Sequence, residues 1–175
     1  MGNFGNKYDM RNALTIINSF SVAYRIAELI IESLKIWIAI KPLQFLFKKR
    51  DKKIRAMLEN CAENSVGKDI IKMLDQYDLK LIPFYEEHDL KHIVLDYGMT
   101  SEEEIRMQAY LFGNGNCSLP CVLFLLSGIL LPSAWGKFYE DYCKGKNSPN
   151  ISRLKLENCM NLPTTELKKK YKNCP

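Results

Sequence analysis

The sequence predicts an all-α protein, a single-domain irregular helical bundle arranged around a central short apolar helix. Apolar residues recur at helical spacing along most of the chain, whereas the alternation typical of strands is hard to find. Glycine and proline interrupt this pattern at intervals that suit short helices. At 175 residues the chain fits one domain, residues 1–175, and its tail from about residue 165 is expected to fray.

Composition narrows the functional classes. With 47% hydrophobic and 26% charged residues, the chain resembles neither a disordered protein nor a polytopic membrane protein. The net charge of +5 comes mostly from residues 48–55 and 168–172. Such clusters suit a solvated helix face or an anionic lipid surface, and we favour the solvated face. Nucleic acid is not expected as a partner, because no groove-reading motif accompanies the charge.

The first predicted helix covers residues 22–40. Its charged residues are spaced by three, four and three positions and therefore follow one stripe: Arg25, Glu28, Glu32 and Lys35. The rest of its surface is apolar, so we expect this helix to pack into the core, with partial membrane docking as the alternative. A second helix is expected to begin at Pro42, because proline is tolerated in the first turn of a helix.

Three shorter helices are predicted next, over residues 65–78, 85–96 and about 101–112. Gly98 can adopt the left-handed backbone that ends the second of them. Thr100 or Ser101 can cap the third, which should end at the glycine-rich residues 113–116.

An uncharged stretch runs from Asn114 to Trp135 and contains an apolar helix over residues 120–131. At about ten to thirteen residues this helix is too short to cross a bilayer, so we expect it to be the innermost helix. Further helices are predicted over residues 134–144 and 164–171.

The six cysteines are expected to be reduced, because the first residues show no apolar signal core that would indicate an oxidising compartment. Cys117 and Cys121 lie beside the apolar run with no further soft ligands near them in sequence. We therefore interpret them as small core residues rather than as a metal pair.

Both histidines of the chain lie in His88-Asp89-Leu90-Lys91-His92. On a helix, positions 88, 89 and 92 are rotated by 0°, about 100° and about 40°, so the two imidazoles and one carboxylate share a sector. Nitrogen plus hard oxygen suits Zn²⁺, Fe²⁺ or Mn²⁺. Surface ion pairs with the three glutamates at 102–104, or a capping box that Glu103 or Glu104 forms with Thr100 or Ser101, would explain the pattern equally well. Spacing alone leaves both interpretations open.

The motif and its spacing resemble the Coq-four family of ubiquinone biosynthesis, whose signature is H-D-x-x-H, eleven residues, then E. Here residues 88–92 are followed by eleven residues and then Glu104. Ser118-Leu119-Pro120 leading into the apolar segment also resembles the family, and the similarity extends over residues 83–135.

This resemblance implies an all-helical fold and a divalent metal, Zn or alternatively Fe or Mn, bound by His88, Asp89, His92 and Glu104. It also implies a channel for an isoprenoid tail, which we expect to be lined by Leu123, Phe124, Leu126 and Leu130 and by residues 30–38. Two imidazoles and two carboxylates would leave a divalent ion almost neutral, with open positions for water and substrate oxygens. No catalytic side chain can be named from the sequence.

The expected function is therefore metal-dependent binding of a prenylated aromatic ring intermediate of quinone biosynthesis, with its oxidative decarboxylation as the candidate reaction. The alternatives are a non-catalytic isoprenoid-binding scaffold and a metal-free helical interaction module. Other quinone-biosynthesis proteins, a membrane surface and a second copy of the chain are the expected partners. Because the chain is rich in Lys, Asn and Ile, as in low-GC bacteria, we expect a cytoplasmic protein, peripheral on the inner face of the membrane.

Overall fold

The computed structural model describes residues 21–33, 48–82 and 85–172 of the chain. Those residues form helices and connecting loops, and their only strand-like feature is an isolated antiparallel bridge between Ser65 and Pro163. The predicted all-α fold class is confirmed.

The elements follow the predicted order, except that the short helix α9 (Leu156–Cys159) was not predicted. Residues 21–33 are helical. After them come α3 (Lys48–Glu59), α4 (Val66–Gln76), α5 (Glu86–Leu95), α6 (Ser101–Gly113), α7 (Leu119–Ser127), the 3-10 turns η2 (Gly128–Leu130) and η3 (Pro132–Ala134), α8 (Trp135–Asn147), α9 (Leu156–Cys159) and α10 (Thr164–Tyr171). The predicted helical residues 34–40 and 42–47 lie outside the described residues.

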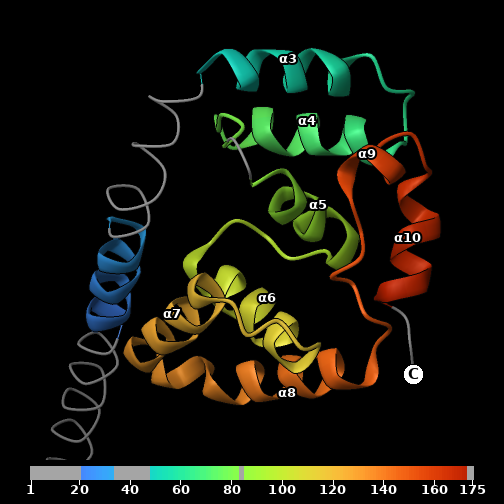
Figure 1. Ribbon diagram of the computed structural model, residues 1–175. Helices are drawn as coiled ribbons and strands as arrows, with labels where there is room; N and C mark the ends of the chain where they lie inside the picture. Colours follow the sequence, from blue (N-terminus) through green and yellow to red (C-terminus); the bar gives the residue numbers. More distant parts are fainter. Residues whose placement is uncertain (1–20, 34–47, 83–84, 173–175) are drawn as a thin grey trace, which may run out of the picture.

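Helix α5 occupies the middle of the arrangement (Figure 1). The pair α3 and α4 lies on one side of it, and the layer formed by α6, α7 and α8 lies on the other (Figure 1). Helix α4 packs on both α3 and α5, α10 packs on α5, and α6 makes its most extensive contacts with α8 and then α7. The two helices that carry the His-Asp-His motif and Glu104 are thus both covered by neighbouring helices.

The larger hydrophobic core joins α4, α5 and α6. Its fully buried side chains include Ile70, Leu90, Val94 and Met107. A smaller cluster joins residues 21–33 to α6 and to η3, and Ile105 lies within it with no exposed surface. Helix α6 contributes to both clusters and is therefore held from two sides.

Glycine allows α6 and α8 to cross closely. A Cβ atom added at Gly145 would lie 1.9 Å from the carbonyl oxygen of Tyr110, and one added at Gly113 would lie 2.1 Å from that of Tyr142. Any side chain at these two positions would push the backbones apart, because the opposing atoms belong to the main chain.

The connection between α5 and α6 is short and closely defined. Asp96 ends α5 in the left-handed conformation, with φ of 63°. The prediction that Gly98 ends this helix was therefore wrong. Lys168 donates a 2.7 Å hydrogen bond to the Asp96 carboxylate, and Lys172 contacts it as well. Thr100 caps α6 as predicted, since its hydroxyl accepts from the Glu103 amide at 3.3 Å. This reversal places the first turn of α6 beside α5.

The expectation that the apolar helix is innermost was wrong. In α7 only Cys121 is buried, whereas Leu119 and Leu123 are 70% and 56% exposed. A nine-residue helix that is apolar on every side can turn only one side toward α6. No other described helix covers its outer side, because α8 packs mainly on α6.

Residues 21–33 also pack differently from the prediction. Ala27 and Ile31 are buried, but Ile26, Leu29 and Ile30 are exposed. The side that faces α6 is mixed. Ala27 and Ile31 pack in one cluster with Ile105, and beside them the Ser101 hydroxyl donates to Glu32 at 2.8 Å and the Tyr24 hydroxyl donates to Glu102. Both apolar packing and hydrogen bonds to the start of α6 thus hold this side of the helix inward.

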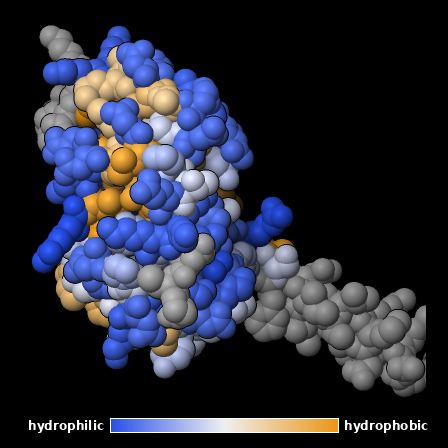
Figure 2. Space-filling view, turned by 90° about the vertical axis from the view of Figure 1, so that its right-hand side faces the viewer, coloured by the Kyte–Doolittle hydropathy of each residue, from blue (hydrophilic) through white to orange (hydrophobic). Residues whose placement is uncertain are grey.

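The helix predicted over residues 164–171 is present as α10. Leu167 and Tyr171 of α10 are buried, and the Tyr110 hydroxyl donates to the Tyr171 carbonyl at 3.1 Å. On the side of the molecule where α9 and α10 lie, the surface is mainly hydrophilic and is interrupted by a strip of apolar residues (Figure 2).

Among the described residues, no single helix is both long and apolar enough to cross a membrane. One pair of consecutive helical segments meets the length and composition of a membrane span only when taken together, and the pair is bent by 109°; its segments are Leu119–Leu130 and Pro132–Asn147.

Candidate metal centre

The two histidines and Glu104 converge where the middle of α5 faces the first turn of α6. His88 Nε2 and His92 Nε2 are 3.1 Å apart, and each lies 3.2 Å from the same oxygen, Glu104 Oε2. The three ligand atoms therefore form a nearly equilateral triangle. The i, i+4 spacing on α5 brings the imidazoles together, and the loop at residues 96–100 brings the carboxylate to them.

The size of this triangle fits a divalent cation. Ligand atoms about 2.1 Å from an ion are about 3.0 Å apart when they occupy adjacent octahedral positions and about 3.4 Å apart in a tetrahedron. The observed 3.1–3.2 Å lies between these values and suits either geometry. A shared face of two histidines and one carboxylate is the arrangement that leaves further positions open in non-haem iron sites.

Burial makes the centre closed on one side and accessible on the other. The side chains of His92 and Glu104 are 0% and 1% exposed, whereas that of His88 is 20% exposed. A carboxylate buried to this degree is costly unless a cation or hydrogen-bond donors stabilise it. Any approach of a small molecule to the triangle would accordingly pass the His88 edge.

Two hydrogen bonds orient the buried ligands. His92 Nδ1 lies 3.2 Å from the Tyr97 carbonyl oxygen and donates to it, which leaves the lone pair on Nε2 directed into the triangle. Gln108 Nε2 donates to Glu104 Oε1 at 2.9 Å, so Oε2 is the oxygen that faces the imidazoles.

Asp89 lies next to this centre but is not among the residues that form the triangle. It is 4% exposed, and its Oδ2 is the buried side-chain oxygen for which the described residues provide no hydrogen-bond partner. Desolvation raises the pKa of Asp89 to about 6, although the nearby imidazoles act in the opposite direction. An unsatisfied carboxylate oxygen beside two histidines fits a site for a cation, and the role of Asp89 as a fourth ligand stays a prediction.

The other two glutamates of the first turn have separate partners. Glu102 accepts from Lys137 at 2.6 Å. Glu103 accepts from Arg106 at 2.5 Å and from the Gly98 amide at 3.3 Å. Ion pairing and capping therefore account for Glu102 and Glu103, whereas Glu104 alone points toward the imidazoles. Helical periodicity alone does not distinguish three consecutive glutamates, and it was the spacing after the His-Asp-His motif that predicted Glu104.

The residues predicted to line an isoprenoid channel lie at the surface. Leu123, Leu126 and Leu130 are 56%, 55% and 46% exposed, and Phe124 is half-buried. They belong to an outward-facing apolar surface rather than to the wall of an enclosed channel. The second expected wall, residues 30–38, lies largely outside the described residues.

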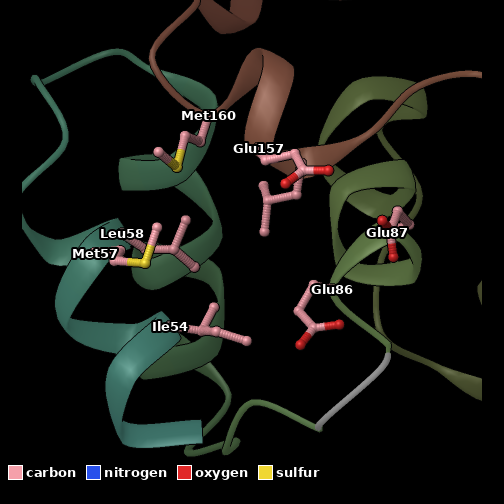
Figure 3. Close-up of a pocket in the computed structure, with 8 residues that line it drawn as sticks. Ile54, Met57, Leu58, Glu86, Glu87, Glu157 and Met160 are labelled. Atoms are coloured by element: carbon pink, nitrogen blue, oxygen red, sulfur yellow. The ribbon is translucent and has the colours of Figure 1, made fainter. Parts of the chain in front are cut away.

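One cavity was not predicted from the sequence. A space of about 380 Å³ lies between α3, α5 and α9, with Ile54, Leu58 and Met160 on one side and Glu86 and Glu157 on the other (Figure 3). Its lining comes from three separate segments, each of which has ordinary helical periodicity, so no local pattern marks it.

Comparison with known proteins gives support at the level of the fold. No protein-family model matches the chain, and no curated protein matches it in sequence. A solved structure from Nostoc punctiforme, of a protein provisionally assigned to ubiquinone biosynthesis, is similar with a TM-score of 0.53 and 16% sequence identity. The similarity covers 97% of this chain and 98% of the Nostoc chain. At this identity the comparison establishes a shared helical fold over the whole length of both chains.

Proposed function

We propose that the protein binds a divalent metal through His88, His92 and Glu104 and uses it on a prenylated aromatic ring intermediate of quinone biosynthesis, carrying out oxidative decarboxylation of the ring. The observation that carries this proposal is the triangle of two imidazole nitrogens and one carboxylate oxygen with sides of 3.1–3.2 Å. The shared fold with the Nostoc protein supports the assignment to quinone biosynthesis.

The residues of the centre have distinct tasks in this proposal. The neutral imidazoles and the Glu104 carboxylate, together with Asp89, would offset the charge of a divalent ion in a buried setting. When bound, such an ion would supply Lewis-acid polarisation of a ring carboxylate and phenol oxygen and a position for dioxygen. The edge at His88 would admit the ring, and the buried side chains of His92 and Glu104 would exclude bulk water from behind.

The overall reaction replaces the ring carboxyl group with a hydroxyl group. In balanced form, the aromatic carboxylic acid, water and dioxygen give the phenol, carbon dioxide and hydrogen peroxide. The bond between the ring carbon and the carboxyl carbon breaks, a bond from the same ring carbon to oxygen forms, and two electrons pass to dioxygen.

A second candidate function is a non-catalytic scaffold that binds isoprenoid lipid and other quinone-biosynthesis proteins. One observation favours it, the apolar surface of α7, η2 and the start of α8. Its exposed side chains are Leu119, Leu123, Leu126, Ile129, Leu130, Trp135 and Tyr139. Exposed apolar surfaces of this kind are typical of interaction sites. We propose a membrane surface on the inner face of the bacterial membrane as its partner, with a second copy of the chain as the alternative.

The decisive experiment combines elemental analysis with a carbon dioxide assay. The protein is purified without a histidine tag, its metal content is measured, and it is loaded in turn with Fe²⁺, Mn²⁺ and Zn²⁺. Each form is then incubated in air with a prenylated hydroxybenzoate that carries ¹⁴C in the carboxyl group. We expect one ion per chain, and release of labelled carbon dioxide that needs both the metal and air.

Matched variants separate the centre from its surroundings. Glu104→Gln should lose the metal and the carbon dioxide release, whereas Glu103→Gln, which changes the neighbouring residue of the same helical turn, should keep both. Stoichiometric metal without turnover, together with binding of the protein to anionic vesicles, would favour the scaffold. A protein that takes up no ion from any of the three solutions would end the proposal of a metal centre.

A further inference from the structure

Gln108 lies one helical turn after Glu104 on α6 and is 5% exposed. Its side-chain nitrogen donates a 2.9 Å hydrogen bond to Glu104 Oε1. Buried amides are usually hydrogen-bonded, but here the partner is the carboxylate of the candidate metal centre rather than the backbone.

This hydrogen bond makes the two oxygens of Glu104 unequal. Oε1 is occupied by the Gln108 amide, whereas Oε2 lies 3.2 Å from each imidazole. Without the amide, the carboxylate could rotate and present both oxygens to an ion. With it, one oxygen is held toward the triangle and the second is held away.

Gln108 is itself fixed in place. Its neighbours Met107 and Ala109 are buried, and its main-chain carbonyl accepts from the Cys121 thiol of α7 at 3.4 Å. The same principle acts on the other helix, where the Tyr97 carbonyl orients His92 through Nδ1. Each buried ligand of the centre therefore has one partner that fixes its direction.

We propose that Gln108 is a positioning residue that restricts Glu104 to a single ligand oxygen and thereby sets both the affinity for the metal and its coordination. This inference rests on the proposed metal centre and deepens it. The amide nitrogen donates to the oxygen of Glu104 that is not part of the triangle, so in this proposal Gln108 acts through Glu104 and not as a ligand.

The test uses Co²⁺, whose visible absorption reports coordination number and whose binding can be titrated. In Gln108→Met the side chain keeps its length and apolar stem but loses the N–H donor. We expect the affinity for Co²⁺ to fall by about 10- to 100-fold, as is typical for loss of an outer partner of a ligand. The absorption should also change in intensity and position, because the carboxylate would be free to bind through both oxygens.

A control variant and a second substitution keep the test clear. Gln76→Met makes the same chemical change at an exposed position of α4 and should leave affinity and spectrum unchanged. Gln108→Asn retains an amide that is one methylene too short, so it should resemble Gln108→Met. Folding of each metal-free variant is checked by circular dichroism and thermal melting before titration.

The outcomes separate this inference from the proposed function. If the unchanged protein binds no Co²⁺, the metal centre itself is wrong. If it binds Co²⁺ and a folded Gln108 variant binds it with the same affinity and spectrum, the centre stands and the positioning role is refuted. Should neither Gln108 variant fold, the residue is a packing residue and the inference is abandoned.

Discussion

Replacing Gly145 with alanine should show how closely the α6–α8 crossing controls the position of the metal centre. The added Cβ would lie 1.9 Å from the Tyr110 carbonyl oxygen, and the next two closest atoms also belong to the Tyr110 backbone. Because ordinary van der Waals contact begins at 3.4 Å, the two helices would have to separate locally by about 1.5 Å, the difference between the two distances.

Overpacking of this kind costs about 1–3 kcal/mol, and we expect about 3 kcal/mol here because no side chain can move aside. A chain of this size loses about 2–4 °C of melting temperature for each kcal/mol, so the melting temperature should fall by roughly 6–12 °C. Tyr110 and Glu104 lie on the same helix, so the shift should also weaken metal binding.

Gly136 provides the matched control on the same helix. A Cβ added there meets no atom within 4 Å. Gly136→Ala should therefore raise the stability by about 0.5–1 kcal/mol through helix propensity alone. Thermal denaturation of both variants, followed by circular dichroism, measures the effect. If Gly145→Ala melted at the same temperature as Gly136→Ala, the close crossing of α6 and α8 would be wrong.

Two further predictions concern titrating side chains. Desolvation raises the pKa of the Cys121 and Cys159 thiols to about 11. At pH 8 iodoacetamide should therefore modify exposed Cys117 and spare those two, as peptide mapping by mass spectrometry can check. Rapid labelling of Cys121 would contradict the burial of its thiol between α7 and α6. The hydrogen bonds from Lys168 and then Lys172 lower the pKa of Asp96 below its ordinary value of 3.8. The stability that these two hydrogen bonds contribute is therefore complete above about pH 3.8, and it is lost as pH falls through the folded-state pKa. Asp96→Asn should therefore lower the free energy of unfolding by at most about 1 kcal/mol at pH 7, because the ion pairs of Asp96 with the two lysines are solvent-exposed. The substitution should also remove the Asp96 contribution to the acid dependence of stability, as urea titrations between pH 2 and 7 can measure. An unchanged acid profile would contradict the contact between α10 and the end of α5.

The positions of most helices followed from local patterns. The predicted segments 65–78, 85–96 and 101–112 correspond to α4, α5 and α6, because their ends are marked by capping residues and by short-range breaks. Thr100 was recognisable as a cap for the same reason. Asp96 was missed as the residue that ends α5, because its left-handed conformation is supported by Lys168 and Lys172, which lie more than seventy positions away.

Burial was the feature that local patterns predicted least well. Hydropathy placed residues 120–131 at the centre, but which helix lies inside depends on which neighbours cover it. Helices α6 and α8 approach each other through Gly113 and Gly145, and this crossing leaves the outer side of α7 uncovered among the described residues. Residues 21–33 similarly turn inward a side that combines the buried Ala27 and Ile31 with the polar contacts of Tyr24 and Glu32, which the charged stripe alone did not indicate.

The sequence by itself determined the helical class, the order of the helices and the presence of two histidines on one sector of α5. These properties depend on spacing within one or two helical turns, which the chain carries locally. The spacing of the motif, through its resemblance to a known signature, had already predicted Glu104 rather than Glu102 or Glu103. Only the tertiary structure showed how the Glu104 side chain reaches those histidines, and that Gln108 and the Tyr97 carbonyl hold the ligands in place. That arrangement depends on the angle at which α6 returns along α5. The angle is set by the loop at residues 96–100 and by the packing of α8 and α10, and contacts between such distant segments leave no periodic trace in the sequence.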